Sequence, residues 1–190
     1  MNTQTLFRFG AIATLLTAFG YFVGEAMYLF GNVQTLFFAW YFIIVSVFQV
    51  FAYIALYAVQ AKRSDIILFI GFVLSILGLL YSFMDSERRL ALRTGLVTQE
   101  QLLKGSEISS LAFLQTAGNV FIILGWIVFG IGVIRSGIFP RWAGILMILA
   151  GVFMVVRDFF IFEYFFAVLS SLAYGWLGWS LWNKAKEITP

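Results

Sequence analysis

Few side chains in this sequence could do chemistry, and most are charged or amide residues within long apolar segments. If those segments cross a membrane, each ionisable residue inside them costs about 2.5–3.5 kcal/mol on insertion scales and is a candidate functional residue by default. Five polar residues are expected at comparable depth beneath one membrane surface: Glu25, Gln115, Asn119, Arg157 and Glu163. We predict that they form one cluster. It is either a ligand or proton site, or a structural or interfacial group, in which an ion pair with amide neighbours fixes helix packing or the charged side chains snorkel to the headgroups.

The sequence does not contain the residues that other kinds of chemistry need. The sequence contains no cysteine and no histidine, so it lacks thiolates and the commonest ligand of zinc, haem and non-haem iron. It has no G-x-S-x-G nucleophile motif and no phosphate-cradling loop, and its aspartates fall at the ends of apolar segments. We therefore expect no enzymatic activity, no metal and no cofactor. The net charge of +3 is read as an orientation signal, and no nucleic-acid partner is expected.

The elements that must position these residues are apolar helices. The 190 residues are 62% hydrophobic and 11% charged, with a mean hydropathy of +0.97, whereas about 25% of residues are charged in a typical soluble domain. Apolar runs of about 18–25 residues are long enough to cross a hydrocarbon core of about 30 Å. We predict an all-α polytopic membrane protein, one domain of six transmembrane helices over residues 6–30, 35–60, 65–84, 110–134, 141–156 and 159–182.

Lysine and arginine counts predict the orientation, because cytoplasmic loops carry more of these residues. Seven lie on the side that holds both ends of the chain, and five lie on the other. We expect a multi-pass protein of the cell (inner) membrane with both termini cytoplasmic and an external segment at 85–109. Leucines recur among charges there, and Thr98 precedes Gln99-Glu100-Gln101 in capping-box order. This pattern favours two short amphipathic helices on the membrane surface over a solvated loop.

One amide is expected near the middle of the membrane. Gln49 lies inside the second apolar segment, one turn from Ser46. Polar side chains at this depth commonly join helices by hydrogen bonds. We therefore interpret Gln49 and Ser46 as interhelical hydrogen-bonding residues and not as part of an ion path.

The segment from Gly125 to Gly151 contains the pattern R-S-G-x-x-P-R-W-x-G. Its residues are Arg135, Ser136, Gly137, Pro140, Arg141, Trp142 and Gly144. This segment resembles one that recurs in uncharacterised bacterial six-helix membrane proteins grouped as a domain of unknown function, where the turn joins helices 4 and 5. The resemblance implies a six-helix fold with an external loop between helices 3 and 4, and it brings no reaction, ligand or functional residue.

Three functions are consistent with these observations. The first is a non-catalytic multi-pass membrane protein that acts by association in the lipid bilayer, as an accessory subunit or a small homo-oligomer. Its support is the small-residue spacing Gly20-x-x-x-Gly24 and Ala167/Ser171/Gly175. The second is a transporter or ligand-binding protein with an outward-facing polar pocket around the predicted cluster. The third is a subunit that binds a hydrophobic cofactor or pigment.

Overall fold

The computed structural model describes residues 3–29, 36–63, 65–96, 98, 100–101, 109–155 and 160–187. Helices and short turns make up this part of the chain, which contains no strand. The helices are α1 (Thr3–Leu29), α2 (Leu36–Gln60), η2 (Ala61–Arg63), α3 (Ile66–Arg93), α5 (Ser109–Ser136), α6 (Arg141–Val155) and α7 (Phe160–Glu187). All six long helices coincide with apolar segments of the sequence, so hydropathy located each of them.

The end of α3 differs from the sequence-based expectation. Hydropathy ends at Met84, where we expected the external segment to begin, but the helix continues to Arg93. The extension adds about 13 Å at 1.5 Å per residue. It ends in a Schellman motif: Gly95 adopts a φ of 73°, the Leu96 N–H donates to Ala91 O at 3.0 Å, and the Gly95 N–H donates to Leu92 O at 3.3 Å. Hydropathy predicts where the apolar part of a helix ends, whereas Gly95 marks where the helix itself ends.

The capping box at Thr98 is confirmed. The Gln101 N–H donates to Thr98 Oγ1 at 3.2 Å, and the Thr98 N–H donates to Gln101 Oε1 at 2.8 Å. These reciprocal bonds satisfy two backbone donors at a helix start. Residues 102–108 and the rest of the predicted surface helices lie outside the described residues.

Four helical segments in the described part of the chain are long and apolar enough to cross a membrane: Gln4–Gly24, Leu36–Arg63, Ile66–Met84 and Thr116–Ser136. The α6 helix is apolar but shorter, at 15 residues. The α7 helix has 28 residues and includes serine, tyrosine and tryptophan side chains that lower its hydropathy. The chain is thus an all-helical protein with several helices of membrane-spanning character.

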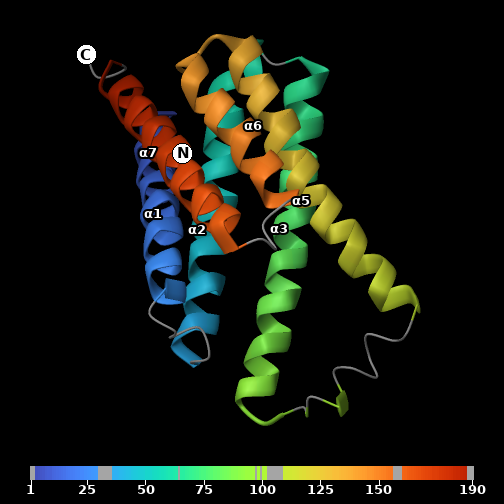
Figure 1. Ribbon diagram of the computed structural model, residues 1–190. Coiled ribbons are helices and arrows are strands. Elements are labelled where there is room, and N and C mark those ends of the chain that lie inside the picture. Colours follow the sequence, from blue (N-terminus) through green and yellow to red (C-terminus); the bar gives the residue numbers. More distant parts are fainter. Residues whose placement is uncertain are drawn as a thin grey trace.

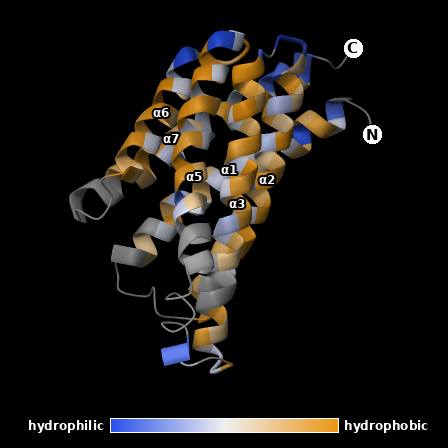
Figure 2. Ribbon diagram, turned by 90° about the vertical axis from the view of Figure 1, so that its right-hand side faces the viewer, coloured by the Kyte–Doolittle hydropathy of each residue, from blue (hydrophilic) through white to orange (hydrophobic). Residues whose placement is uncertain are grey.

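The six long helices form a closed ring (Figure 1). Each packs against two neighbours, in the order α1, α2, α3, α5, α6, α7 and back to α1. The α1 and α7 helices are antiparallel, because Leu15 packs against Gly178 and Ala18 packs against Gly175. Hydrophobic residues cover most of the length of the bundle, and hydrophilic residues gather at one end (Figure 2). We call it the basic end, and define it by Arg8, Lys62, Arg63, Arg135, Arg141, Lys184 and Lys186.

Glycines bring α3 and α5 into close contact. A Cβ at Gly71 would lie 2.4 Å from the backbone nitrogen of Phe129, and one at Gly78 would lie 2.8 Å from the Ile122 backbone. On the facing helix, a Cβ at Gly125 would lie 2.7 Å from the backbone nitrogen of Ser75. Only hydrogen in place of a side chain permits this approach, which is how small residues pack helices in lipid.

Candidate functional site

The predicted polar cluster falls mostly outside the described residues. Arg157 lies outside them, as do the side chains of Glu25, Gln115 and Glu163, although their helices are described. Asn119 is half-buried on α5. Glu25 and Glu163 lie on the neighbouring helices α1 and α7, while α5 contacts α3 and α6. The cluster stays a prediction.

A different polar cluster lies inside the ring, and we call its five residues the core cluster: Tyr21, Gln49, Tyr53, Ser75 and Tyr174. Its centre is Gln49 on α2, which is 3% exposed. The Tyr21 hydroxyl on α1 donates to Gln49 Oε1 at 3.2 Å, and Gln49 Nε2 donates to the Tyr174 hydroxyl on α7 at 2.8 Å. The prediction that Gln49 makes interhelical hydrogen bonds is therefore confirmed, and one amide joins three helices.

Two other hydroxyls of the core cluster lack hydrogen bonds. Tyr53, one turn after Gln49 on α2, and Ser75 on α3 are both buried, and neither hydroxyl makes a hydrogen bond to protein atoms. The Tyr53 hydroxyl nevertheless lies within hydrogen-bonding reach of Ser75, Tyr174 and Gln49, and the buried hydroxyls and amide thus form one uncharged group.

Aromatic rings enclose the core cluster. Trp126 of α5 meets Tyr21 of α1 edge to face at 5.8 Å between ring centroids and Tyr174 of α7 at 5.3 Å. Tyr21 and Tyr174 stack at 5.9 Å, and Tyr53 meets Phe129 at 5.0 Å. Because α5 does not neighbour α1 or α7 in the ring, these contacts place the rings in its middle. The centre of the bundle is a packed aromatic core with an uncharged hydrogen-bonding group inside it.

Sequence reasoning found part of the core cluster. It identified Gln49 as a polar residue within an apolar segment, but it missed Tyr53 and Ser75, and it missed Trp126 among the rings around the cluster. The usable signal is the spacing of Gln49 and Tyr53, which places them on one face of α2 one turn apart. Tyrosine and tryptophan are counted among the hydrophobic residues of the composition, so a search for charged and amide residues passes over their polar atoms.

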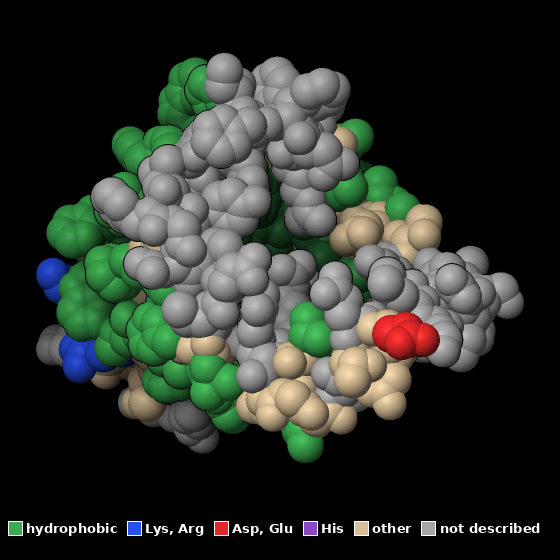
Figure 3. Space-filling view, turned by 60° about the horizontal axis from the view of Figure 1, so that its bottom comes forward, with side chains coloured by type: hydrophobic (Ala, Val, Ile, Leu, Met, Phe, Trp, Pro, Cys, Tyr) green, Lys and Arg blue, Asp and Glu red, His purple; other side chains and the backbone are tan. Residues whose placement is uncertain are grey.

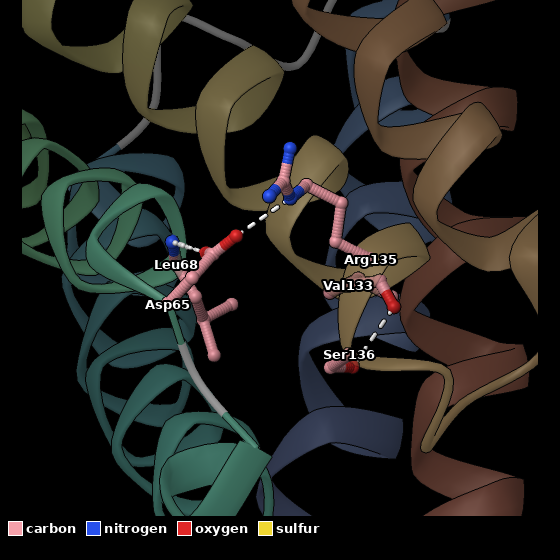
Figure 4. A network of polar contacts seen from close by, with 5 residues as sticks. All are labelled: Asp65, Leu68, Val133, Arg135 and Ser136. Atoms are coloured by element: carbon pink, nitrogen blue, oxygen red, sulfur yellow. Dashed lines mark hydrogen bonds and ion pairs between the residues drawn. The ribbon is translucent and has the colours of Figure 1, made fainter.

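A second polar network closes the basic end (Figure 4). The Arg135 Nε lies 2.6 Å from Asp65 Oδ2, and the Ser136 hydroxyl lies 3.0 Å from Val133 O. Outside this view, the Ser136 hydroxyl donates to Gln60 Oε1 at 2.6 Å. Asp65 also caps α3, because its Oδ1 accepts from the Leu68 N–H at 3.2 Å. The network joins the corner between α2 and α3 to the end of α5. Gln60 and Ser136 are buried, while Arg135 and Asp65 remain partly exposed.

The ionisation of Asp65 follows from these contacts. The hydrogen bond from the Leu68 backbone N–H, aided by Arg135, holds the pKa of the Asp65 carboxyl below its ordinary value, against a smaller opposing effect of desolvation. The ion pair is therefore intact at neutral pH. Its role is structural, because it fixes the start of α3 against the end of α5.

The network gives physical roles to the R-S-G-x-x-P-R-W-x-G turn. Gly137 has a φ of 62°, which ends α5 in a conformation that favours glycine. A Cβ at Gly144 would lie 2.6 Å from Gly130 O, so this glycine permits close packing of α6 on α5. Trp142 is 68% exposed at the start of α6, as expected for an anchor at headgroup depth.

Comparison of the sequence and structure with protein-family models, curated proteins and solved structures finds no match. The resemblance of the segment from Gly125 to Gly151 to the bacterial six-helix family stays a prediction.

Proposed function

We propose that this chain is a non-catalytic multi-pass membrane protein that acts by association, as an accessory subunit or a small oligomer. Its six long helices would form one transmembrane domain. Four of them have segments of membrane-spanning length and apolarity. Support for six comes from the ring, because α6 and α7 lie side by side between α5 and α1.

The charge distribution supports an orientation in the cell (inner) membrane with both termini cytoplasmic. Side chains of the basic end are exposed, among them Arg8, Lys62, Arg63 and Arg141. Cytoplasmic flanks of membrane helices carry such an excess of lysine and arginine. The view toward the opposite end shows mostly hydrophobic and uncharged side chains on the described surface (Figure 3). The 85–109 segment would then be external.

The packed centre favours association over a transport path. Tyr53, Phe129 and Tyr174 are fully buried, and their rings contact one another at the centre of the ring. A transporter of the alternating-access type needs a binding site that opens between helix groups. A core filled by aromatic rings suits a protein that works through its outer surface.

The small-residue motifs do not provide that outer surface. A Cβ at Gly20 would lie 2.6 Å from the Val45 side chain, and one at Gly24 would lie 3.4 Å from Tyr41. Ala167 is buried, and Gly175 faces Ala18. The packing of helices within one chain uses the same small residues as the packing between chains. These motifs therefore hold the ring together and leave a different surface for a partner.

The outer face of α7 carries an apolar stripe, and Trp176 within it distinguishes this face from the other lipid-facing surfaces. The stripe consists of Phe165, Val168, Leu172, Trp176 and Trp179, each about half exposed. Trp176 follows Gly175, which faces Ala18 of α1. Ala18 lies one turn, about 6 Å, from the midpoint of the apolar span Gln4–Gly24. In the proposed topology the indole would thus lie well inside the hydrocarbon depth.

The proposal rests on the depth of the exposed Trp176 indole. Tryptophans facing lipid prefer headgroup depth, where the indole N–H can hydrogen-bond. Tryptophan is also enriched among the residues that dominate protein interfaces. We infer that a helix of another copy or of a partner subunit covers Trp176 in the bilayer.

The cysteine-free sequence permits a direct test by disulfide crosslinking in native membranes. A Leu172→Cys variant should form a crosslinked dimer if the stripe joins two copies. The matched control is Leu80→Cys, an exposed position on α3, which should stay monomeric. Equal crosslinking of both variants would show random collision and contradict a specific interface.

A partner subunit is tested by native mass spectrometry after gentle extraction. The wild-type chain should retain a defined second protein, and Trp176→Leu should lose it. Trp142→Leu, an exposed tryptophan at the basic end, should retain it. A chain that forms no Leu172→Cys dimer and carries no second protein would overturn the proposal.

A further inference from the structure

We propose that the basic end binds the headgroup phosphate of an anionic phospholipid between Arg8 of α1 and Lys186 of α7. Both side chains are exposed, and they come from helices that contact each other along the ring. The site is separate from the partner surface on α7, and it requires only that the helices are inserted in a bilayer.

The register of α1 and α7 places the two cations at the same level. Leu15 packs against Gly178 and Ala18 packs against Gly175. The same antiparallel register, continued toward the basic end, brings Lys186 to within about one residue of Arg8. Both ends of the chain lie on the same side of the bundle (Figures 1 and 2). Helices in contact have axes about 8–10 Å apart, so these two long side chains can meet one headgroup.

Arg8 lies inside an apolar span, on the face that points away from the bundle. It follows the start of the span Gln4–Gly24 by four residues, about 6 Å. Ile12, Leu15 and Phe19 follow it at helical spacing, and each is more than a third exposed. An arginine that faces lipid extends its side chain to the headgroup layer. The acceptors that it meets there are lipid phosphates.

Lys186 continues the outer face of α7 in the same way. It lies two helical turns after Trp179 of the apolar stripe, and seven residues return to the same face of a helix. The apolar outer faces of α1 and α7 thus each end in one exposed cation at the basic end. This arrangement matches an amphipathic ligand, with acyl chains along the helices and a phosphate between the two cations.

The protein supplies little negative charge to these cations. The seven lysines and arginines of the basic end share it with two carboxylates, those of Asp65 and Glu187. Asp65 is engaged by Arg135. Within the part of the chain that the structure describes, neither Arg8 nor Lys186 forms an ion pair, although Glu187 directly follows Lys186. An anionic leaflet attracts such cations, and basic sites between membrane helices bind lipid headgroups.

Native mass spectrometry of the purified chain tests the site by titration with phosphatidylglycerol and with phosphatidylcholine of identical acyl chains. Each lysine or arginine near an anionic surface contributes about a factor of five to binding. The wild-type chain should therefore prefer phosphatidylglycerol by about 25-fold. Arg8→Gln and Lys186→Gln should each weaken its binding about fivefold and leave phosphatidylcholine binding unchanged. Equal binding of the two lipids by the wild type would overturn the proposal.

A matched double variant separates a local site from general surface charge. Lys62→Gln/Arg63→Gln removes two exposed cations of the same end and should keep the preference, whereas Arg8→Gln/Lys186→Gln should lose it. Equal losses in the two double variants would rule out a site at Arg8 and Lys186. Arg8→Lys, which keeps the charge, should bind as the wild type does.

Thermal unfolding gives a second readout, because a ligand that binds the folded state raises Tm. Phosphatidylglycerol should raise the Tm of the wild type and of Lys62→Gln/Arg63→Gln, but not that of Arg8→Gln/Lys186→Gln. An equal rise in all three would refute the site. Inorganic phosphate should have no such effect on the wild type. A rise as large as that with the lipid would assign the site to a free anion and contradict lipid binding.

Discussion

The hydroxyl of Ser136 lies 2.6 Å from Oε1 of Gln60, and this hydrogen bond joins the last residues of α5 and α2. Gln60 is fully buried, and its Nε2 donates to Leu56 O at 2.9 Å. Its side chain is therefore paired at both atoms. At the basic end, Gln60 therefore connects α2 to α5, two helices that are not neighbours in the ring.

Ser136→Ala should lower the stability by about 1–3 kcal/mol, because it leaves Gln60 Oε1 buried without a donor. Thermal unfolding in detergent measures the effect. The double variant Ser136→Ala/Gln60→Leu removes both partners, and it should recover part of the loss. A double variant less stable than Ser136→Ala would contradict the assignment of this bond.

Gly71→Ala should destabilise the protein by at least about 1–3 kcal/mol, the usual cost of overpacking. Its new Cβ would meet backbone atoms of Phe129 that cannot move without separating α3 from α5. Gly175→Ala is the matched control, because its Cβ would meet only Ala18 at an ordinary 3.9 Å. That variant should be neutral or slightly more stable, since alanine favours a helix over glycine. Equal Tm values for the two variants would contradict the close α3 to α5 packing.

Gly137→Ala should cost about 1–2 kcal/mol, because a side chain disfavours a φ of 62°. No atom lies within 4 Å of the position that its Cβ would take, so the loss reports backbone strain alone. Gly137→Asn should lose less, because asparagine tolerates this conformation better. Equal losses in the two variants, measured by thermal unfolding, would point to a cause other than backbone conformation.

Stability should depend on pH through Asp65. Its pKa is lower in the folded protein than in the unfolded chain, so its contribution is fully present above the ordinary aspartate pKa of about 3.9. The contribution declines as the pH falls through that value and is lost below the folded-state pKa. Asp65→Asn should flatten this acidic part of the Tm profile. A profile identical to that of the wild type would contradict the lowered pKa that the Leu68 N–H and Arg135 give Asp65.

The proposed topology predicts which positions a membrane-impermeant maleimide can label. Thr94→Cys, at the end of α3, should react in intact cells, and Lys62→Cys should react only after permeabilisation. Both positions are exposed in the structure, and the sequence has no other cysteine. The reverse pattern would invert the orientation. Labelling of both positions from one side would mean that α3 does not cross the membrane.

Much of the fold could be predicted from the sequence, because long apolar runs specify helices wherever water is absent. The end of α3 was missed since Ser86 to Arg93 is polar but compatible with a helix, and only Gly95 marks its stop. The core cluster was missed in part because the search for polar residues in the spans considered charged and amide side chains and passed over the hydroxyls of Tyr53 and Ser75. Which helix each residue faces depends on the order of helices around the ring, and spacing along one helix does not contain that order.

The pairing of α1 with α7 means that the ring has no gap between its first and last helices. The start of α1 and the end of α7 both lie at the basic end. The order in which the helices pack should therefore not depend on which of them the chain connects. A circularly permuted gene that links α7 to α1 by a flexible connector, and opens the chain between α3 and α5, should assemble the same ring.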